Sequence, residues 1–385
     1  MTKKWSSRLT FFAFVVLMVG LGSNDSLRGI FSTIFQEHFS LTTTQLGLIV
    51  TASYIGNLVF LLVGGNLSTR FSKKRVLQVL ILIWMAALAL FAFTSNYTVL
   101  LIGMALALGS STLLNTTMNL ITPLLFATAP GFFVNFLFFT QEIGTSGSQY
   151  ILGSHADGFA FWQHTNLVLL ILGAVAFVLL LFCNVPEEAA APADAPAQKG
   201  GYDWRIIVPY VLVFGFYFIA EHGVMNWMVD GLGLPQASAA KYLSVFFGGM
   251  MIGRLCLSPL VDKLGALKSL AAFGGVSCVL YLIGSLGGAV TMPVWAISGL
   301  SFSILYPTLV MSIRLYFPAQ QVSGAAGTIL SIASLADILF NVGFGKLVDM
   351  TGYAVSIRVL PLSALAFFIV FILFTKFCKP TQKLK

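Results

Sequence analysis

The sequence predicts an all-α membrane protein with twelve transmembrane helices in two six-helix bundles, and three observations lead to it. Of the 385 residues, 58% are hydrophobic and only 9% are charged, with a mean hydropathy of +0.92. Soluble domains carry about 25% charged residues. Hydrophobic runs long enough to cross a bilayer recur along the whole chain. One long polar segment divides these runs into two equal groups.

Each predicted span is a mainly apolar run that ends at a short polar or charged loop. The first run is too long for a signal peptide, lacks a small-residue cleavage site and carries Asp25, so we expect it to be retained. A membrane β-barrel would show alternation in segments of about ten residues, and the sequence has no such pattern. We expect spans near 9–34, 44–67, 76–94, 98–126, 131–154, 165–183, 205–229, 241–261, 268–287, 290–313, 321–347 and 356–375.

The net charge of +8 reflects topology rather than a nucleic-acid partner. Lysines and arginines gather at both ends of the chain and in the loop after the second span, and Lys199, Arg205, Lys263 and Lys268 fall on the same side. By the positive-inside rule, both termini are then cytoplasmic. We therefore expect a multi-pass protein of a bacterial inner (cytoplasmic) membrane.

The central polar segment, residues 185–203, is rich in Ala, Pro and charge. This composition is typical of a flexible linker. It predicts an N-terminal bundle at 1–184 and a C-terminal bundle at 204–385, joined on the cytoplasmic side.

The two halves also repeat a loop. GNLSTRFSKK follows the second span from Gly65, and SPLVDKLGALK follows the eighth span from Ser258, so the copies begin 193 residues apart (258 − 65). Parallel halves of six spans are the layout of a duplicated transporter whose site lies near the bilayer midplane.

These loops resemble the signature loop of the major facilitator superfamily, although Thr69 stands where the family usually has Asp. The resemblance implies the major facilitator fold and alternating access by rocking of the two bundles. It also implies that loop residues latch one conformation. The expected latch residues are Gly65, Arg70, Arg254, Asp262 and Lys263.

Asp25 and Arg28 place an acid and a base inside the first hydrophobic run. A charge at that depth is costly unless it is paired, hydrated or neutralised. The pair therefore indicates a solute or proton pathway. A structural ion pair is the alternative, because positions i and i+3 share a helix face.

Other polar residues concentrate in spans one, four, five, seven, ten and eleven. Any one of these polar residues could simply form a hydrogen bond between two helices. Together they favour a polar translocation site. The candidate solute contacts are Asn24, Arg28, Asn115, Asn119, Gln141, Asn226, Trp227, Tyr306 and Asn341.

Four short motifs are similar to the fucose–proton symporter branch of that superfamily. The resemblance implies that Asp25 couples proton entry to solute binding. The branch has a second acid in span four where this chain has Asn115, so Glu142 or Glu221 is expected to replace it. Arg28 is also a departure: it would favour a permanent ion pair or bind an anionic solute. The motifs are Asn24-Asp25, Leu114–Asn119, Tyr306-Pro307-Thr308, and Tyr217 with Glu221 and Trp227.

No nucleophile elbow, metal-ligand cluster or phosphate loop is present, so we expect no enzyme, no cofactor and no metal. The sequence favours a secondary transporter that imports a small polar solute, a monosaccharide, with protons. Its expected partners are that solute, protons and the bilayer, and we expect a monomer. Three alternatives stay open: a proton-driven exporter of drugs or amphipathic compounds, a transporter of anionic or lipid-linked solutes that uses Arg28, and a sensor without transport.

Overall fold

The computed structural model describes residues 3–64, 70–153, 157–186, 202–222, 232–356 and 358–382. Within these ranges every regular element is a helix, which confirms the predicted fold class. The chain forms two compact units, unit 1 (residues 1–133 and 137–190) and unit 2 (residues 191–385 and 134–136). Residues 187–201 lie outside the described ranges. The linker at 185–203 and the bundle limits at 184 and 204 therefore stay predictions.

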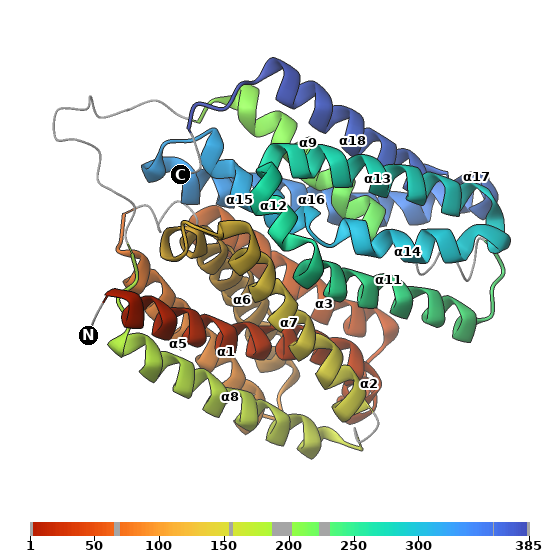
Figure 1. Ribbon diagram of the computed structural model, residues 1–385. Helices are drawn as coiled ribbons and strands as arrows, with labels where there is room; N and C mark the ends of the chain where they lie inside the picture. Colours follow the sequence, from red (N-terminus) through yellow and green to blue (C-terminus); the bar gives the residue numbers. More distant parts are fainter. Residues whose placement is uncertain are drawn as a thin grey trace. The chain divides into compact units, whose positions relative to one another are not determined.

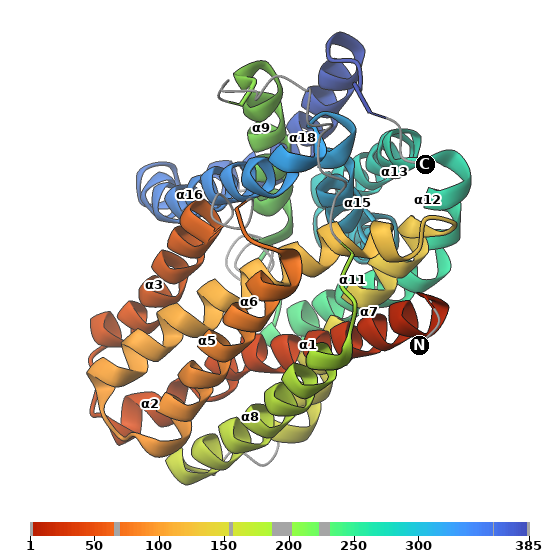
Figure 2. The same cartoon turned by 90° about the vertical axis from the view of Figure 1, so that its left-hand side faces the viewer.

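In unit 1, α6 lies between α3 and α5, and α8 packs against both α1 and α5. Figure 1 shows α8 alongside α1, and Figure 2 shows α3, α5 and α6 side by side. The elements from residue 3 to residue 182 are α1 (Lys3–Ile30), α2 (Ser32–His38), α3 (Thr43–Val59), the π-helical turn η1 (Phe60–Gly64), α5 (Lys73–Phe93), α6 (Tyr97–Leu125), α7 (Pro130–Gly153) and α8 (Phe159–Phe182).

In unit 2, α9 packs against α16 and α18, and α14 lies between α11 and α13. Figure 2 shows α9 beside α18. The elements are α9 (Trp204–His222), α11 (Gln236–Cys256), α12 (Ser258–Leu264), α13 (Ala266–Leu286), η3 (Gly288–Thr291), α14 (Met292–Phe302), α15 (Leu305–Ser312), η4 (Ile313–Leu315), α16 (Ala319–Thr351), α17 (Tyr353–Ser356) and α18 (Val359–Phe377).

Among the described residues, ten helices are long and apolar enough to cross a membrane, or eleven if the bent pair α11–α12 is one span. These correspond to eleven of the twelve predicted spans. The remaining one, predicted at 131–154, is α7, which has 24 residues. It is long enough to cross, but polar residues such as Gln141 and Glu142 lower its mean hydropathy.

Helix starts in unit 1 follow from local capping. The Thr42 side chain accepts a hydrogen bond from the Gln45 backbone at 3.3 Å, and the Gln45 side chain accepts one from the Thr42 backbone at 2.9 Å. This capping box satisfies two amide groups that the first turn of α3 would leave without partners. Asn96 caps α6 with a single bond: its side-chain oxygen accepts from the Val99 amide at 3.2 Å.

Prolines break the predicted spans eight and ten in unit 2. Proline has no N–H, so it leaves the carbonyl four residues earlier without its helical partner. Next to Pro259, α11 and α12 meet at an angle of 50°. The Ser258 hydroxyl donates to the carbonyl of Leu255, the one that Pro259 leaves open, at 3.2 Å. The α14–α15 break precedes Pro307.

Glycines allow the closest helix contacts in both units. A Cβ at Gly56 of α3 would overlap the carbonyl of Ala105 in α6. A Cβ at Gly299 of α14 would overlap the carbonyl of Phe246 in α11. The second and fourth spans of each half thus pack backbone to backbone, as a duplicated fold requires. Small residues permit this approach where lipid supplies no hydrophobic driving force.

We expect Gly56→Ala to destabilise the protein by about 1–3 kcal/mol, because the added methyl group overpacks the α3–α6 contact. Gly47→Ala is the matched control on the same helix, since a Cβ there meets no atom within 4 Å. Thermal unfolding of the purified protein in detergent measures both. Equal melting temperatures for the two variants would show that the α3–α6 contact is not tight.

Candidate functional site

The first polar cluster of unit 1 surrounds Asp25 in α1. The Asn24 side chain hydrogen-bonds the Asp25 carboxylate, and Arg28 lies within electrostatic range one turn later. From α6, the Ser111 hydroxyl donates to Asp25 Oδ1 across 3.5 Å. Asn24 and Ser111 are both buried. The acid that the sequence places in the first span therefore has a polar partner from a second helix.

One turn further along α6, Asn115 joins α7. Its Nδ2 donates to Oε1 of Gln141 at 2.7 Å. Both side chains are half-buried, as is the neighbouring Glu142. Since residues four apart share a helix face, Ser111 and Asn115 present one polar stripe of α6. This stripe brings together predicted contacts from spans one, four and five.

Asn119 continues the stripe by one more turn and is 1% exposed. Neither its amide oxygen nor its amide nitrogen has a hydrogen-bond partner among the described residues. A buried polar group without a partner costs about 1–3 kcal/mol. Asn119 therefore offers a free donor and a free acceptor beside the Asn115–Gln141 pair.

A reciprocal pair of hydrogen bonds holds α1 against α7 beside this cluster. Ser23 Oγ donates to the Gly144 carbonyl at 3.2 Å, and Thr145 Oγ1 donates to the Gly22 carbonyl at 3.1 Å. A Cβ at Gly22 or Gly144 would overlap the backbone of the facing helix. This α1–α7 contact is next in sequence to Asn24 and Asp25 on α1 and to Glu142 on α7. It therefore sets the distance between the polar residues of the two helices.

Sequence reasoning missed Ser111, Ser23 and Thr145 as members of this site. Serines and threonines are common in transmembrane helices, and most close onto their own backbone. The available signal was spacing: Ser111 precedes Asn115 and Asn119 at four-residue intervals.

Unit 2 holds a second cluster, built on two tyrosines. The rings of Tyr217 in α9 and Tyr306 in α15 stack with centroids 6.1 Å apart. Phe214 and Phe218 flank Tyr306 at 5.9 and 6.0 Å. Glu221, one turn after Tyr217, hydrogen-bonds the Tyr217 side chain. Glu221 therefore lies next to a cluster of aromatic side chains.

Arg254 of α11 belongs to the same surroundings. It is 5% exposed. Its Nε donates to the Ser303 carbonyl at 3.4 Å, the carbonyl that Pro307 leaves without a helical donor. Arg254 and Glu221 both lie within electrostatic range of Tyr217 and Tyr306. The predicted role of Arg254 as a latch stays a prediction, and its position also makes it a member of the tyrosine cluster.

Of the other predicted latch residues, Arg70 and Lys263 are exposed and Asp262 is half-buried. Gly65, Asn226 and Trp227 lie outside the described residues, as does the side chain of Asn341. Across the described ranges, no group of three or more His, Cys, Asp or Glu residues could hold a metal ion.

The model of the Major Facilitator Superfamily matches residues 10–336 of this chain. The chain belongs to the Major Facilitator Superfamily. It is a multi-pass membrane transporter and not an enzyme. The predicted resemblance, to this superfamily and to its fucose–proton symporter branch, is confirmed.

Two relatives and one solved structure extend this result. The chain is 27% identical over 344 residues to a glucose/galactose transporter of Brucella abortus, covering 82% of this chain and 81% of the relative. It is 24% identical over 329 residues to the L-fucose-proton symporter of Escherichia coli, covering 74% and 75%. The crystal structure of the E. coli fucose:proton symporter matches with a TM-score of 0.79 at 20% identity, over 97% of this chain and 99% of that one.

A double-mutant cycle tests the tyrosine cluster. We expect Arg254→Gln and Glu221→Gln each to lower thermal stability, and the double variant to recover part of the loss, because each charge is left with less compensation when the other is removed. The coupling energy should be about 0.5–3 kcal/mol. Arg70→Gln, at an exposed arginine, is the control and should change little. If the losses of stability in the two single variants add up to the loss in the double variant, Arg254 and Glu221 do not interact.

Proposed function

We propose that this protein imports a monosaccharide together with protons, by alternating access, across a bacterial inner membrane. The observation that carries the proposal is Asp25, an acid inside a span with Asn24, Ser111 and Arg28 around it. The names of the two relatives, a glucose/galactose transporter and an L-fucose-proton symporter, support the sugar and the proton. We also propose a monomer with both termini in the cytoplasm.

Proton uptake acts through the partners of Asp25. A protonated carboxyl attracts Arg28 less and accepts the Ser111 hydrogen bond less strongly. Ser111 and Arg28 are then free to turn towards a solute. Coupling requires that the proton favours one conformation over another, since a ligand shifts an equilibrium only by its differential affinity. Loss of a buried charge supplies that difference.

Within unit 1, the sugar contacts are Asn115, Gln141 and Asn119. Sugar hydroxyl groups both donate and accept hydrogen bonds, and so do side-chain amides. Asn119 has both functions without a partner in the described part of the chain, which makes it the strongest of the three candidates. A site built to hydrogen-bond a hydroxyl discriminates strongly against analogues that lack it.

Within unit 2, Tyr306 and its aromatic neighbours offer apolar faces with polar tips, which suits the mixed surface of a sugar ring. We propose Glu221, and not Glu142, as the second acid. Glu221 hydrogen-bonds Tyr217, and Arg254 lies within electrostatic range of the same tyrosine. Asn226, Trp227 and Asn341 stay candidate solute contacts.

The direct test replaces Asp25 with Asn. In proteoliposomes with an imposed pH gradient, we expect wild-type protein to concentrate galactose, glucose or fucose, and Asp25→Asn to lose this gradient-driven uptake. Sugar exchange without a gradient should persist, because the variant keeps the shape of the site. Asp157→Asn, at an exposed acid outside the spans, is the matched control. Concentrative uptake by Asp25→Asn at the wild-type level would remove Asp25 from the coupling role.

Arg28 supports a second candidate function, transport of an anionic solute such as a sugar acid. A guanidinium binds a carboxylate through two parallel hydrogen bonds, and Arg28 is half-buried beside Asp25.

Competition distinguishes the two candidates. For a monosaccharide importer, excess galactose should block uptake of labelled galactose by the wild type and excess galacturonate should not. Transport of galacturonate that Arg28→Gln abolishes would instead favour the anionic solute.

A further inference from the structure

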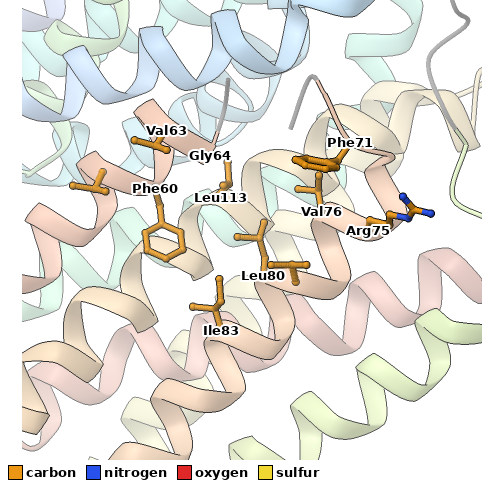
Figure 3. Close-up of a pocket in the computed structure, with 11 residues that line it drawn as sticks. Phe60, Val63, Gly64, Phe71, Arg75, Val76, Leu80, Ile83 and Leu113 are labelled. Carbon is orange, nitrogen blue, oxygen red and sulfur yellow. The ribbon is translucent and has the colours of Figure 1, made fainter. Parts of the chain in front are cut away.

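Unit 1 has an apolar groove of about 440 Å³ between α3, η1, α5 and α6. Its walls are almost entirely hydrocarbon, as Figure 3 shows. Several of its side chains are close to half exposed or more, including Val59, Val63, Phe71 and Val79. Arg75 is the one charged side chain among the described residues that line it. In Figure 3 the guanidinium of Arg75 lies at one end, directed away from the apolar side chains.

Local backbone structure makes this groove. At the end of α3 the chain changes from an α-helix to the π-helical turn η1. A π-helix is rare and marks a local widening of the helix, often at a functional position. Gly64 closes the turn without a side chain, and the place of its Cβ is taken by Leu113 of α6. The absence of a side chain at Gly64 lets Leu113 pack against the turn as part of the groove wall.

The position of the groove along the spans is also defined. One candidate span ends at Gly64 and the next begins at Lys73. The walls of the groove therefore come from the end of one candidate span and the start of the next, where these spans approach the bilayer surface, and Arg75 stands in the first turn of the second span. The backbone N–H of Arg75 donates to the Ser72 side chain at 3.4 Å, so Arg75 sits in a capped first turn of α5. Arg70, close in sequence, is exposed as well.

We propose that this groove binds an anionic phospholipid, with one acyl chain along the apolar wall and the phosphate on Arg75. Burying an acyl chain in the groove matches hydrocarbon with hydrocarbon, and phosphate pairs with guanidinium through bidentate hydrogen bonds. Basic sites between helices at the membrane surface select anionic headgroups. All of the lining side chains except Phe71 belong to candidate membrane spans, which makes a lipid the occupant rather than a water-soluble ligand. The proposal depends on membrane insertion and not on the identity of the transported solute.

Lipid retention tests the charge. Wild type and variants are incorporated into nanodiscs of equal parts phosphatidylcholine and phosphatidylglycerol, extracted with mild detergent, and the bound lipids are counted by mass spectrometry. We expect wild type to retain phosphatidylglycerol and Arg75→Gln to retain about fivefold less, the effect of one basic residue near an anionic surface. Arg205→Gln, an exposed arginine in the first turn of α9, is the matched control. Equal retention by Arg75→Gln and Arg205→Gln would overturn the proposal.

Filling the groove tests the acyl chain independently. Val79→Trp places a large side chain in the groove, and Val178→Trp on α8 is the control because Val178 is equally exposed and does not line it. A bound lipid raises the melting temperature by mass action. We expect phosphatidylglycerol to stabilise wild type and Val178→Trp more than phosphatidylcholine does, and this difference to vanish in Val79→Trp. Equal stabilisation of wild type by the two lipids, or the same response in both tryptophan variants, would contradict a specific lipid site.

Discussion

The hydrocarbon core of a bilayer offers no hydrogen-bond partner, so each polar group within a span has to be satisfied by the protein itself or by what it carries. Most serines and threonines of α6 meet this constraint locally. Ser110, Thr117 and Thr122 each donate to the carbonyl four residues earlier, at 2.6 to 2.7 Å. A hydroxyl group that is satisfied within its own helix gives no indication of a functional site. The side chains that reach another helix, or reach nothing, are the informative ones: Asp25, Asn115 and Asn119 in unit 1 and Arg254 in unit 2.

The same constraint applies to the backbone carbonyls that prolines leave without a helical donor. A proline inside a span removes one N–H and leaves a carbonyl that must find another donor. Pro209, Pro259 and Pro307 each do so, and the freed carbonyls accept from Cys378, Ser258 and Arg254 respectively. Only the third acceptance involves a charged side chain. The break in span ten thus does more than bend a helix, because it supplies the contact that holds Arg254 beside the tyrosine pair.

Much of the fold could be predicted from the sequence. Apolar runs of about twenty residues are unambiguous, and eleven of the predicted spans agree with described helices by length and composition. The twelfth, α7, was predicted as an apolar run, although its polar residues leave it out of the helices that are apolar enough to cross a membrane. The turn η1 was not predicted, because it depends on how neighbouring helices pack. The breaks in spans eight and ten were not predicted either, although Pro259 and Pro307 stand in the sequence, because a proline can be accommodated in a membrane helix without breaking it.

The site could be predicted only in part. Polarity inside a hydrophobic run identified Asp25, Asn115, Gln141 and Glu221, because burial of such groups is costly wherever they point. Their partners depend on how each helix is rotated, which one sequence does not give. Ser111 was missed for that reason. Arg254 was placed by its distance in sequence from a loop motif, whereas its side chain donates to the Ser303 carbonyl and lies within electrostatic range of Tyr217 and Tyr306.

The central claim is that sugar and proton cross together, and the measurement that tests it most directly is sugar-driven proton movement by the unmodified protein. Proteoliposomes with a trapped pH-sensitive dye are prepared without a pH gradient, and a sugar concentration gradient is applied from outside. The account predicts that the lumen acidifies as the sugar enters, and that a proton ionophore abolishes the acidification. Entry of the sugar at the same rate with no change in luminal pH would contradict it.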